Sequence, residues 1–167
     1  SRKLIEASAF LKDESVTAGN VGKMGQAFKQ FQGQELWKKT IGLIGLGAVG
    51  REVASRLSGF GARILAADPC ISKEQAALAG AELVDLDTLL GKSDFVSLHA
   101  AVTAETNGMI GAAQFREMKK GAVLINTARA ALVNEPALIT ALDCGHLGGA
   151  ALDTFNQEPP GFDHPLI

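Results

Sequence analysis

Three closely spaced glycines and a distant carboxylate are the residues of this chain whose spacing could do the most specific chemistry. Gly45, Gly47 and Gly50 follow one short apolar segment, and Asp68 ends the next one. Between a strand and a helix, Gly45 permits a tight turn, Gly47 lets a phosphate approach the backbone, and Gly50 allows close helix–strand packing. The free N–H groups at the start of such a helix attract a pyrophosphate. The pattern predicts dinucleotide binding, against the alternative of a glycine turn that serves only packing.

The position of Asp68 indicates which dinucleotide would bind. The motif requires an acid about 20 residues beyond the glycines, at the end of the second strand. A carboxylate there can accept hydrogen bonds from both ribose hydroxyls, and it repels a 2′-phosphate. Asp68 meets this requirement, so the sequence predicts NAD rather than NADP as the cofactor.

Four further polar residues follow apolar segments in the same way as Asp68. They are His99, Arg129, Asp153 and Glu158. In open α/β sheets, ligands bind outside the carboxyl ends of the strands. We therefore expect these side chains to gather at one edge of a sheet and to line a functional crevice there.

Strand-like and helix-like segments alternate along the chain from residue 40 onward, and these are the elements that must position the polar residues. The expected strands are 40–44, 63–67, 81–84, 95–98, 122–126 and 147–152. The expected helices are 48–60, 72–79, 86–91, 111–119 and 134–143. This alternation predicts an α/β protein with a Rossmann doubly wound parallel sheet and helices on both faces.

The chain divides by composition into three parts. Residues 1–36 are expected to form an N-terminal arm or linker with an amphipathic helix at 2–12. Residues 37–160 are expected to form the dinucleotide-binding domain, and 161–167 to begin the return to a second domain. A chain of 167 residues is long enough for one domain with a sizeable core.

Composition excludes several classes of function. The net charge is −2 and the basic residues are scattered, so no nucleic-acid surface is predicted. No apolar run is long enough to span a bilayer, so no membrane segment is predicted. Cys70 and Cys144 do not suggest a disulfide framework, which favours the cytoplasm. His99, His146 and His164 lack metal-ligand spacing, so no metal site is predicted.

Residues 42–159 resemble the cofactor domain of the D-isomer-specific 2-hydroxyacid dehydrogenases. The segments that carry the resemblance are Gly45–Arg51, Asp68–Pro69, Asp94–His99, Glu105–Ile110, Phe115–Arg129 and Gly148–Pro159. The block from Met118 to Arg129, together with the later Asp-x-Phe-x-x-Glu-Pro, is more specific than the glycine loop alone. The resemblance implies an NAD-dependent oxidoreductase acting on a 2-hydroxy or 2-oxo acid, with 3-phosphoglycerate a candidate substrate.

The resemblance also implies a role for each candidate residue. Arg129 would bind the carboxylate and carbonyl of the substrate, and Glu158 would hydrogen-bond the family's catalytic histidine. Residues that would contact the cofactor, besides the three glycines and Asp68, are Ala48, Val49, His99, Ala100, Thr127, Ala128 and Asp153. The competing interpretations are a surface arginine for Arg129, a solvated loop acid for Glu158, a turn-capping acid for Asp153 and a packed, hydrogen-bonded histidine for His99.

The family pattern also limits what this chain is expected to do. The catalytic histidine of the family lies beyond Ile167, and His164 should not be mistaken for it. The chain is therefore expected to be an excised or partial cofactor domain that binds NAD and turns over little alone. Lys38 stands where the family usually has glycine. By analogy, a homodimer is expected.

Two alternatives remain open at the level of sequence. One is a non-catalytic NAD-sensing module, similar to the transcriptional corepressors that share this fold. The other is a formate dehydrogenase-like enzyme. Retention of Arg129 and Glu158 weighs against simple loss of catalysis but does not exclude the NAD-sensing module.

Overall fold

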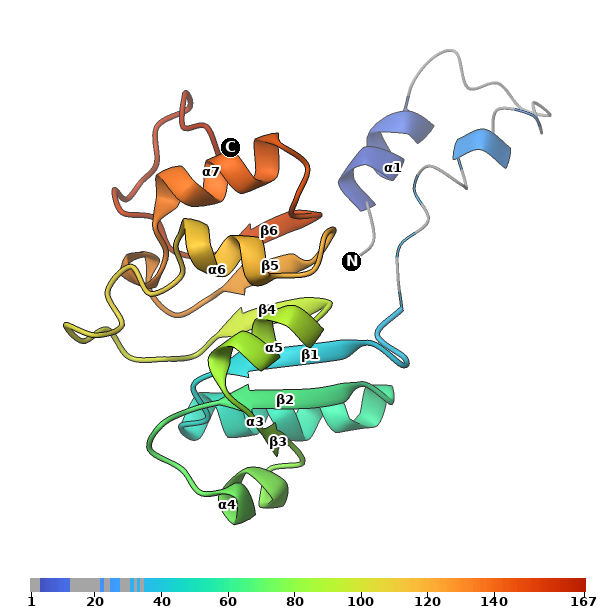
Figure 1. Ribbon diagram of the computed structural model, residues 1–167. Coiled ribbons are helices and arrows are strands. Elements are labelled where there is room, and N and C mark those ends of the chain that lie inside the picture. Colours follow the sequence, from blue (N-terminus) through green and yellow to red (C-terminus); the bar gives the residue numbers. More distant parts are fainter. Residues whose placement is uncertain (1–3, 13–21, 23–24, 28–30, 32, 34) are drawn as a thin grey trace. The chain divides into compact units, whose positions relative to one another are not determined.

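The computed structural model describes residues 4–12, 22, 25–27, 31, 33 and 35–167 (Figure 1). By internal contacts the chain separates into two compact units, Ser1–Leu36 and Trp37–Ile167. In the first unit, the helix predicted at 2–12 is present as α1, Leu4–Leu11, while residues 2 and 3 lie outside the described part. The rings of Phe10 and Phe31 are 5.5 Å apart in this unit.

The second unit contains a six-stranded, fully parallel sheet. Its strands are β1 (Thr40–Ile44), β2 (Arg63–Ala67), β3 (Glu82–Leu83), β4 (Phe95–Leu98), β5 (Val123–Asn126) and β6 (Gly149–Leu152). Their spatial order is β3-β2-β1-β4-β5-β6. The chain adds β2 and β3 on one side of β1 and then β4, β5 and β6 on the other side, so the strand order reverses between β1 and β4. This is the strand order of a doubly wound dinucleotide-binding fold, and the predicted fold class is confirmed.

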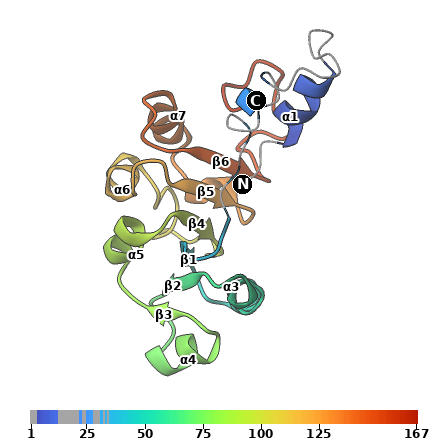
Figure 2. The ribbon, with the colours of Figure 1, turned by 90° about the vertical axis from the view of Figure 1, so that its right-hand side faces the viewer.

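Helices connect the strands and cover both faces of the sheet. They are α3 (Ala48–Leu57), α4 (Lys73–Leu78), α5 (Leu86–Lys92), α6 (Ala112–Glu117) and α7 (Glu135–Asp143), with short 3₁₀ helices η1 (Ser58–Phe60) and η2 (Ala130–Leu132). Figures 1 and 2 show α5, α6 and α7 on one face and α3 on the other. None of the helices in the described residues is long and apolar enough to cross a bilayer.

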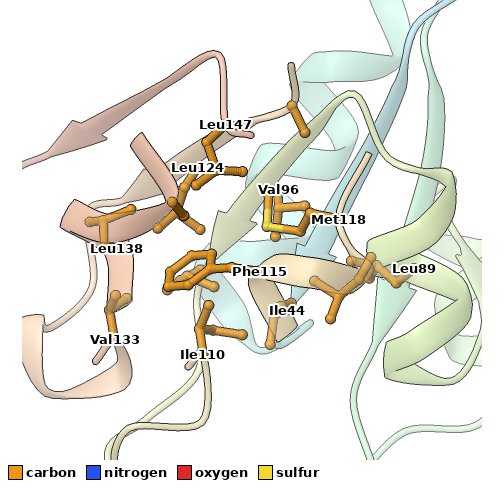
Figure 3. Packing of buried hydrophobic residues seen from close by; sticks show 14 of the residues in the cluster. Ile44, Leu89, Val96, Ile110, Phe115, Met118, Leu124, Val133, Leu138 and Leu147 are labelled. Carbon is orange, nitrogen blue, oxygen red and sulfur yellow. The ribbon is translucent and has the colours of Figure 1, made fainter. Parts of the chain in front are cut away.

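Most of the core lies between the sheet and the α5–α6–α7 layer. The side chains labelled in Figure 3 gather around Phe115 of α6, which is 2% exposed. Val96 and Leu124 contribute from the sheet, and Leu89 and Leu138 from the neighbouring helices. Burying such side chains is the main force that fixes the helices on the sheet and the sheet edge that carries the site.

The strands and helices expected from residue 40 onward are all present, and some of their ends differ from the prediction. β3 has two residues rather than the predicted four because it pairs with β2 alone at the edge of the sheet. β6 begins at Gly149 rather than 147, since Leu147 turns into the core. The predicted helix 48–60 ends as α3 at Leu57 and continues as η1.

Lys38 adopts a backbone conformation that explains why glycine suits its position. Its φ is +60°, in the left-handed region that L-residues with a side chain seldom occupy. Its N–H donates to the carbonyl of Gly61 (3.0 Å), and its ammonium lies 4.0 Å from the centre of the Trp37 ring. The chain therefore enters β1 through a strained turn, and this cation–π contact helps to offset the cost of the strained backbone.

Candidate functional site

The glycine loop lies where the strand order reverses, between β1 and β4. Gly45 has φ +92° and its N–H donates to the carbonyl of Ala67 (2.9 Å). A Cβ at Gly45 would come within 2.8 Å of the Ala100 nitrogen, and one at Gly50 would collide with the Gly45 carbonyl. Around Gly47, by contrast, a Cβ would meet nothing within 4 Å. Two glycines are thus needed for packing of the chain, and the third leaves open space above the loop.

The first turn of α3 faces this open space. Gly47 is its N-cap and makes no side-chain hydrogen bond to the N–H groups at the start of the helix. Ala48 and Val49 are exposed there, with side chains too small to block an approaching group. An uncapped helix start beside an open glycine fits a pyrophosphate.

Asp68 follows β2 and braces the same loop. Its Oδ2 accepts a hydrogen bond from the Leu46 N–H (2.7 Å), and its Oδ1 accepts one from the Cys70 N–H (2.8 Å). A carboxylate oxygen has two lone pairs, so both oxygens keep capacity for the hydroxyls of a ribose. Sequence reasoning missed the bracing contacts, because they depend on how the two strand ends meet in space.

His99 and Ala100 follow β4 and lie directly against the glycine loop. The His99 N–H donates to the Ile44 carbonyl (2.7 Å), and its ring Nε2 is 3.0 Å from the Ser97 hydroxyl. Burial lowers the pKa of His99, so its imidazole is neutral at neutral pH. His99 is therefore a packed, hydrogen-bonded histidine, and its backbone lies directly against the turn at Gly45.

The loop after β5 carries Thr127, Ala128 and Arg129. Thr127 and Arg129 are exposed, and Ala128 is half-buried. One guanidinium N–H of Arg129 donates to the Ala128 carbonyl (2.7 Å). A guanidinium has five N–H donors, so the remaining ones are sufficient for a two-oxygen grip on a carboxylate.

Asp153 and Glu158 follow β6 and are both exposed. The Asp153 N–H donates to the carbonyl of Asn126 (3.0 Å), which joins this strand end to that of β5. Glu158 Oε1 accepts a hydrogen bond from the Phe155 N–H (3.0 Å). The loop that carries Glu158 is fastened to the start of α7, where the Glu135 carboxylate contacts Asn156 (3.1 Å) and His164 (3.3 Å).

The structure thus brings the candidate residues together in two groups. The first consists of the glycine loop with Asp68, His99 and Ala100, and the second of the β5 loop with Asp153. Within the part of the chain that the structure describes, no hydrogen bond or ion pair joins Glu158 to Arg129. Both groups and Glu158 follow the carboxyl ends of parallel strands, at one edge of one sheet (Figure 1).

Three residues near the site were not singled out from the sequence. Asn126 ends β5 and is buried, Ser97 is buried beside His99, and Glu135 holds the loop after β6. A signal was available for the first two: each is a polar residue inside or at the end of an otherwise apolar strand. Such residues are seldom buried without a hydrogen-bonding role.

Comparison with known proteins places this geometry in a family. Residues 1–167 match the family described as D-isomer specific 2-hydroxyacid dehydrogenase, NAD binding domain. The chain is 48% identical to a D-3-phosphoglycerate dehydrogenase of Archaeoglobus fulgidus, over 83% of this chain and 26% of the relative. It is 40% identical to a glyoxylate reductase of Korarchaeum cryptofilum, over 100% of this chain and 48% of the relative.

Solved structures agree with these relatives. The fold superposes on the TT0316 protein of Thermus thermophilus with a TM-score of 0.83 and 35% identity, over 98% of this chain and 49% of that one. It also matches the NAD-complexed D-isomer specific 2-hydroxyacid dehydrogenase of Lactobacillus delbrueckii ssp. bulgaricus, with a TM-score of 0.72 and 41% identity. That match covers 81% of this chain and 41% of that one.

The chain spans about a quarter of the length of the phosphoglycerate dehydrogenases it matches, and about half of the glyoxylate reductase. The resemblance and the NAD cofactor expected from the sequence are both confirmed. The chain belongs to the NAD-binding domain family of the D-isomer-specific 2-hydroxyacid dehydrogenases.

Proposed function

We propose that the protein containing this chain is an NAD-dependent oxidoreductase that interconverts a D-2-hydroxy acid and its 2-oxo acid. The observation that carries the proposal is the placement of Arg129 at the same sheet edge as the glycine loop, one strand away from His99. The names of the relatives, D-3-phosphoglycerate dehydrogenase and glyoxylate reductase, support this substrate class. With 48% identity to the former, 3-phosphoglycerate is the first substrate to test.

In this proposal the glycine loop and Asp68 hold the cofactor. The N–H groups of Ala48 and Val49 bind the pyrophosphate above Gly47, where the structure leaves open space. Asp68 accepts the ribose hydroxyls and keeps its bonds to the loop. NAD supplies or accepts the hydride when it is bound.

The second group of residues serves the nicotinamide end and the substrate. Thr127, Ala128 and Asp153 lie beside the nicotinamide riboside and amide. Arg129 binds the substrate carboxylate, because its planar guanidinium grips two oxygens and stays charged at all relevant pH values. The same positive charge stabilises negative charge that develops on the carbonyl oxygen during reduction.

Glu158 acts through the catalytic histidine of the family. A carboxylate beside an imidazole favours its protonated form, which raises the pKa of that histidine and lets it donate a proton. The hydrogen bond from Phe155 engages one oxygen of Glu158. The second oxygen remains available for the imidazole.

The test is a turnover assay on the complete reading frame that encodes this chain. NADH absorbance is followed with a panel of 2-oxo acids that includes 3-phosphohydroxypyruvate and glyoxylate. We expect one of these acids to support oxidation of NADH. Arg129→Ala should lower kcat/KM for that acid by about 10²-fold or more, as loss of a transition-state charge contact does. Arg116→Ala is the matched control, because Arg116 is exposed on α6 and follows no strand.

Two other outcomes would favour the competing functions. Tight NADH binding without turnover of any acid would contradict the proposal and favour an NAD-sensing module. Reduction of NAD with formate, but not with a 2-hydroxy acid, would favour a formate dehydrogenase-like enzyme.

We also propose that the protein is a homodimer located in the cytoplasm. Large apolar side chains that remain exposed in the second unit, such as Trp37, Phe60 and Leu78, support association. The two exposed, unpaired cysteines, Cys70 and Cys144, suit a reducing compartment. Light scattering after gel filtration tests the dimer, and fractionation of cells tests the compartment.

A further inference from the structure

Asn126 is a polar residue in a place where a polar residue is costly. It is the last residue of β5, and only 1% of its surface is exposed. Burying an amide without hydrogen bonds costs free energy, so a buried asparagine is retained where its bonds are satisfied. Its partners therefore show what the residue does.

Both ends of the Asn126 amide bind the loop that follows it. Oδ1 accepts a hydrogen bond from the Ala128 N–H (3.1 Å), and Nδ2 donates one to the Arg129 carbonyl (2.8 Å). The main-chain carbonyl of Asn126 accepts a bond from the Asp153 N–H (3.0 Å). One buried residue thus connects the loop of Arg129 with the end of β6.

These contacts determine where the Arg129 side chain begins. The Arg129 carbonyl accepts from Asn126 and also from the Leu132 N–H (3.2 Å), which closes η2. The Asn126 amide therefore holds the Ala128 N–H before Arg129 and the carbonyl of Arg129 itself, while the Arg129 side chain remains exposed. Without the amide of Asn126, the loop would lose both of the side-chain hydrogen bonds that join it to the buried strand among the described residues.

We propose that Asn126 is a positioning residue: it holds the Arg129 loop in the conformation that presents the guanidinium to the substrate. This inference rests on the proposed function, since it assigns Arg129 a substrate. Displacing a substrate-binding group by about 1 Å can cost about 10²-fold in rate. Asn126 acts without touching substrate or cofactor, through the backbone of the residue that does.

The experiment compares Asn126→Ala with Asn134→Ala in the complete protein. Asn134 is a matched control, because its side chain also binds one backbone N–H, that of Ala137, but caps α7 instead of the Arg129 loop. We expect Asn126→Ala to lower kcat/KM for the 2-oxo acid about 10²-fold, and Asn134→Ala to lower the unfolding temperature while kcat/KM stays within about 2-fold.

Combination with Arg129→Ala shows whether the effect passes through Arg129. If it does, Asn126→Ala lowers kcat/KM by less than about 3-fold in a protein that already lacks the guanidinium, because the two residues act as a unit. Multiplication of the two losses would overturn the proposal. If Asn126→Ala does not fold, Asn126→Asp is used, since it keeps the size and the acceptor for Ala128 but replaces the donor Nδ2 by oxygen.

Amide hydrogen exchange supplies a readout that does not depend on turnover. We expect exchange at Ala128 and Leu132 to become faster in Asn126→Ala, exchange at Leu132 to become faster in Asn126→Asp, and both rates to stay unchanged in Asn134→Ala. Unchanged exchange at both amides would overturn the proposal even if activity fell. A failure of the proposed function is seen separately: in that case Arg129→Ala alone would leave kcat/KM unchanged, or no acid would be reduced.

Discussion

At the scale of the residue, single polar side chains at strand ends connect the parts of the site. Asp68 holds the glycine loop through Leu46 and its own turn through Cys70. Asn126 does the same for the loop after β5. Each side chain therefore has a structural task in addition to any contact with a ligand, and substitutions will affect stability and binding together.

Asp68→Ala should change the choice between the two dinucleotides. The substitution removes the acceptor for the ribose hydroxyls and the charge that repels a 2′-phosphate. We expect NADH affinity to fall about 10-fold and NADPH affinity to rise, so that the preference for NADH narrows or disappears. Fluorescence titration of both cofactors measures it, with Asp163→Ala as a control at an exposed acid in the loop after β6. An unchanged affinity ratio would contradict the role assigned to Asp68.

Thr154→Val should stabilise the protein. The Thr154 hydroxyl oxygen is buried, and within the described residues it has no hydrogen-bond partner. Removing an unsatisfied buried hydroxyl with a side chain of the same shape gains about 1 kcal/mol, which raises the unfolding temperature by about 2–4 °C. Thr140→Val is the control, because the Thr140 hydroxyl is exposed and already donates to the Pro136 carbonyl (2.9 Å). A lower melting temperature for Thr154→Val would show that the hydroxyl is satisfied in solution.

At the scale of the element, the sequence pattern predicts the strands best where they are buried. β1, β2 and β4 have the predicted bounds, because each is an apolar run that ends abruptly at polar or turn residues. β3 and β6 are shorter than predicted, since they lie at the two edges of the sheet and pair on one side only. Apolar composition alone does not tell an edge strand from the turn beside it.

From the sequence, the candidate site is predictable only where the order of the strands determines the position of a residue. The order of strands and the rule of carboxyl ends bring Asp68, Arg129 and Asp153 to one edge. The pairing of Asn126 with the Arg129 carbonyl, or of Ser97 with His99, depends on loop conformation and side-chain rotamers. No periodicity in the sequence predicts these hydrogen bonds.

The glycine loop offers a prediction that separates packing from binding. Gly47→Ala adds a methyl group in open space, whereas Gly50→Ala places one against the Gly45 carbonyl. We expect Gly47→Ala to leave the unfolding temperature within about 2 °C of the original while NADH affinity falls about 10-fold or more, because the methyl group occupies the approach of the pyrophosphate.

Gly50→Ala should lower both the stability of the protein and its affinity for NADH. The loop or the helix must move to accept the new methyl group, and overpacking of this kind costs about 1–3 kcal/mol. Calorimetry of the free protein and titration with NADH separate the two effects. Equal losses of NADH affinity and of stability in the Gly47 and Gly50 variants would contradict the assignment of different tasks to these glycines.

At the scale of the whole molecule, Asp94 ties elements together at the sheet edge opposite the site. Its Oδ2 accepts from the Thr40 N–H at the start of β1 (2.8 Å), and its Oδ1 pairs with the Lys119 ammonium after α6 (3.0 Å). Its main chain bonds to Thr40 and to Val123 at the start of β5. Three strands therefore begin in register around one carboxylate, and their far ends carry the candidate site.

The ionisation of Asp94 makes this arrangement sensitive to acid. Burial raises the pKa of Asp94, but the hydrogen bond from Thr40 and the pairing with Lys119 outweigh burial and hold the pKa below its ordinary value. A lowered pKa in the folded state means that the carboxylate contributes stability above its ordinary pKa of about 4. That contribution disappears as the pH falls through the lower, folded-state value.

Asp94→Asn should therefore destabilise the protein at neutral pH and much less in acid. We expect a loss of about 1 kcal/mol in the free energy of unfolding at pH 7, since the pair with Lys119 is partly exposed and screened by solvent. Near pH 3 the difference between variant and original should shrink, because the original has begun to lose its carboxylate. Urea unfolding at both pH values measures this, with Lys119→Met expected to behave similarly and its exposed neighbour Lys120→Met as the matched control. A difference of equal size at pH 7 and pH 3 would mean that Asp94 holds the strands by its shape and hydrogen bonds rather than by its charge.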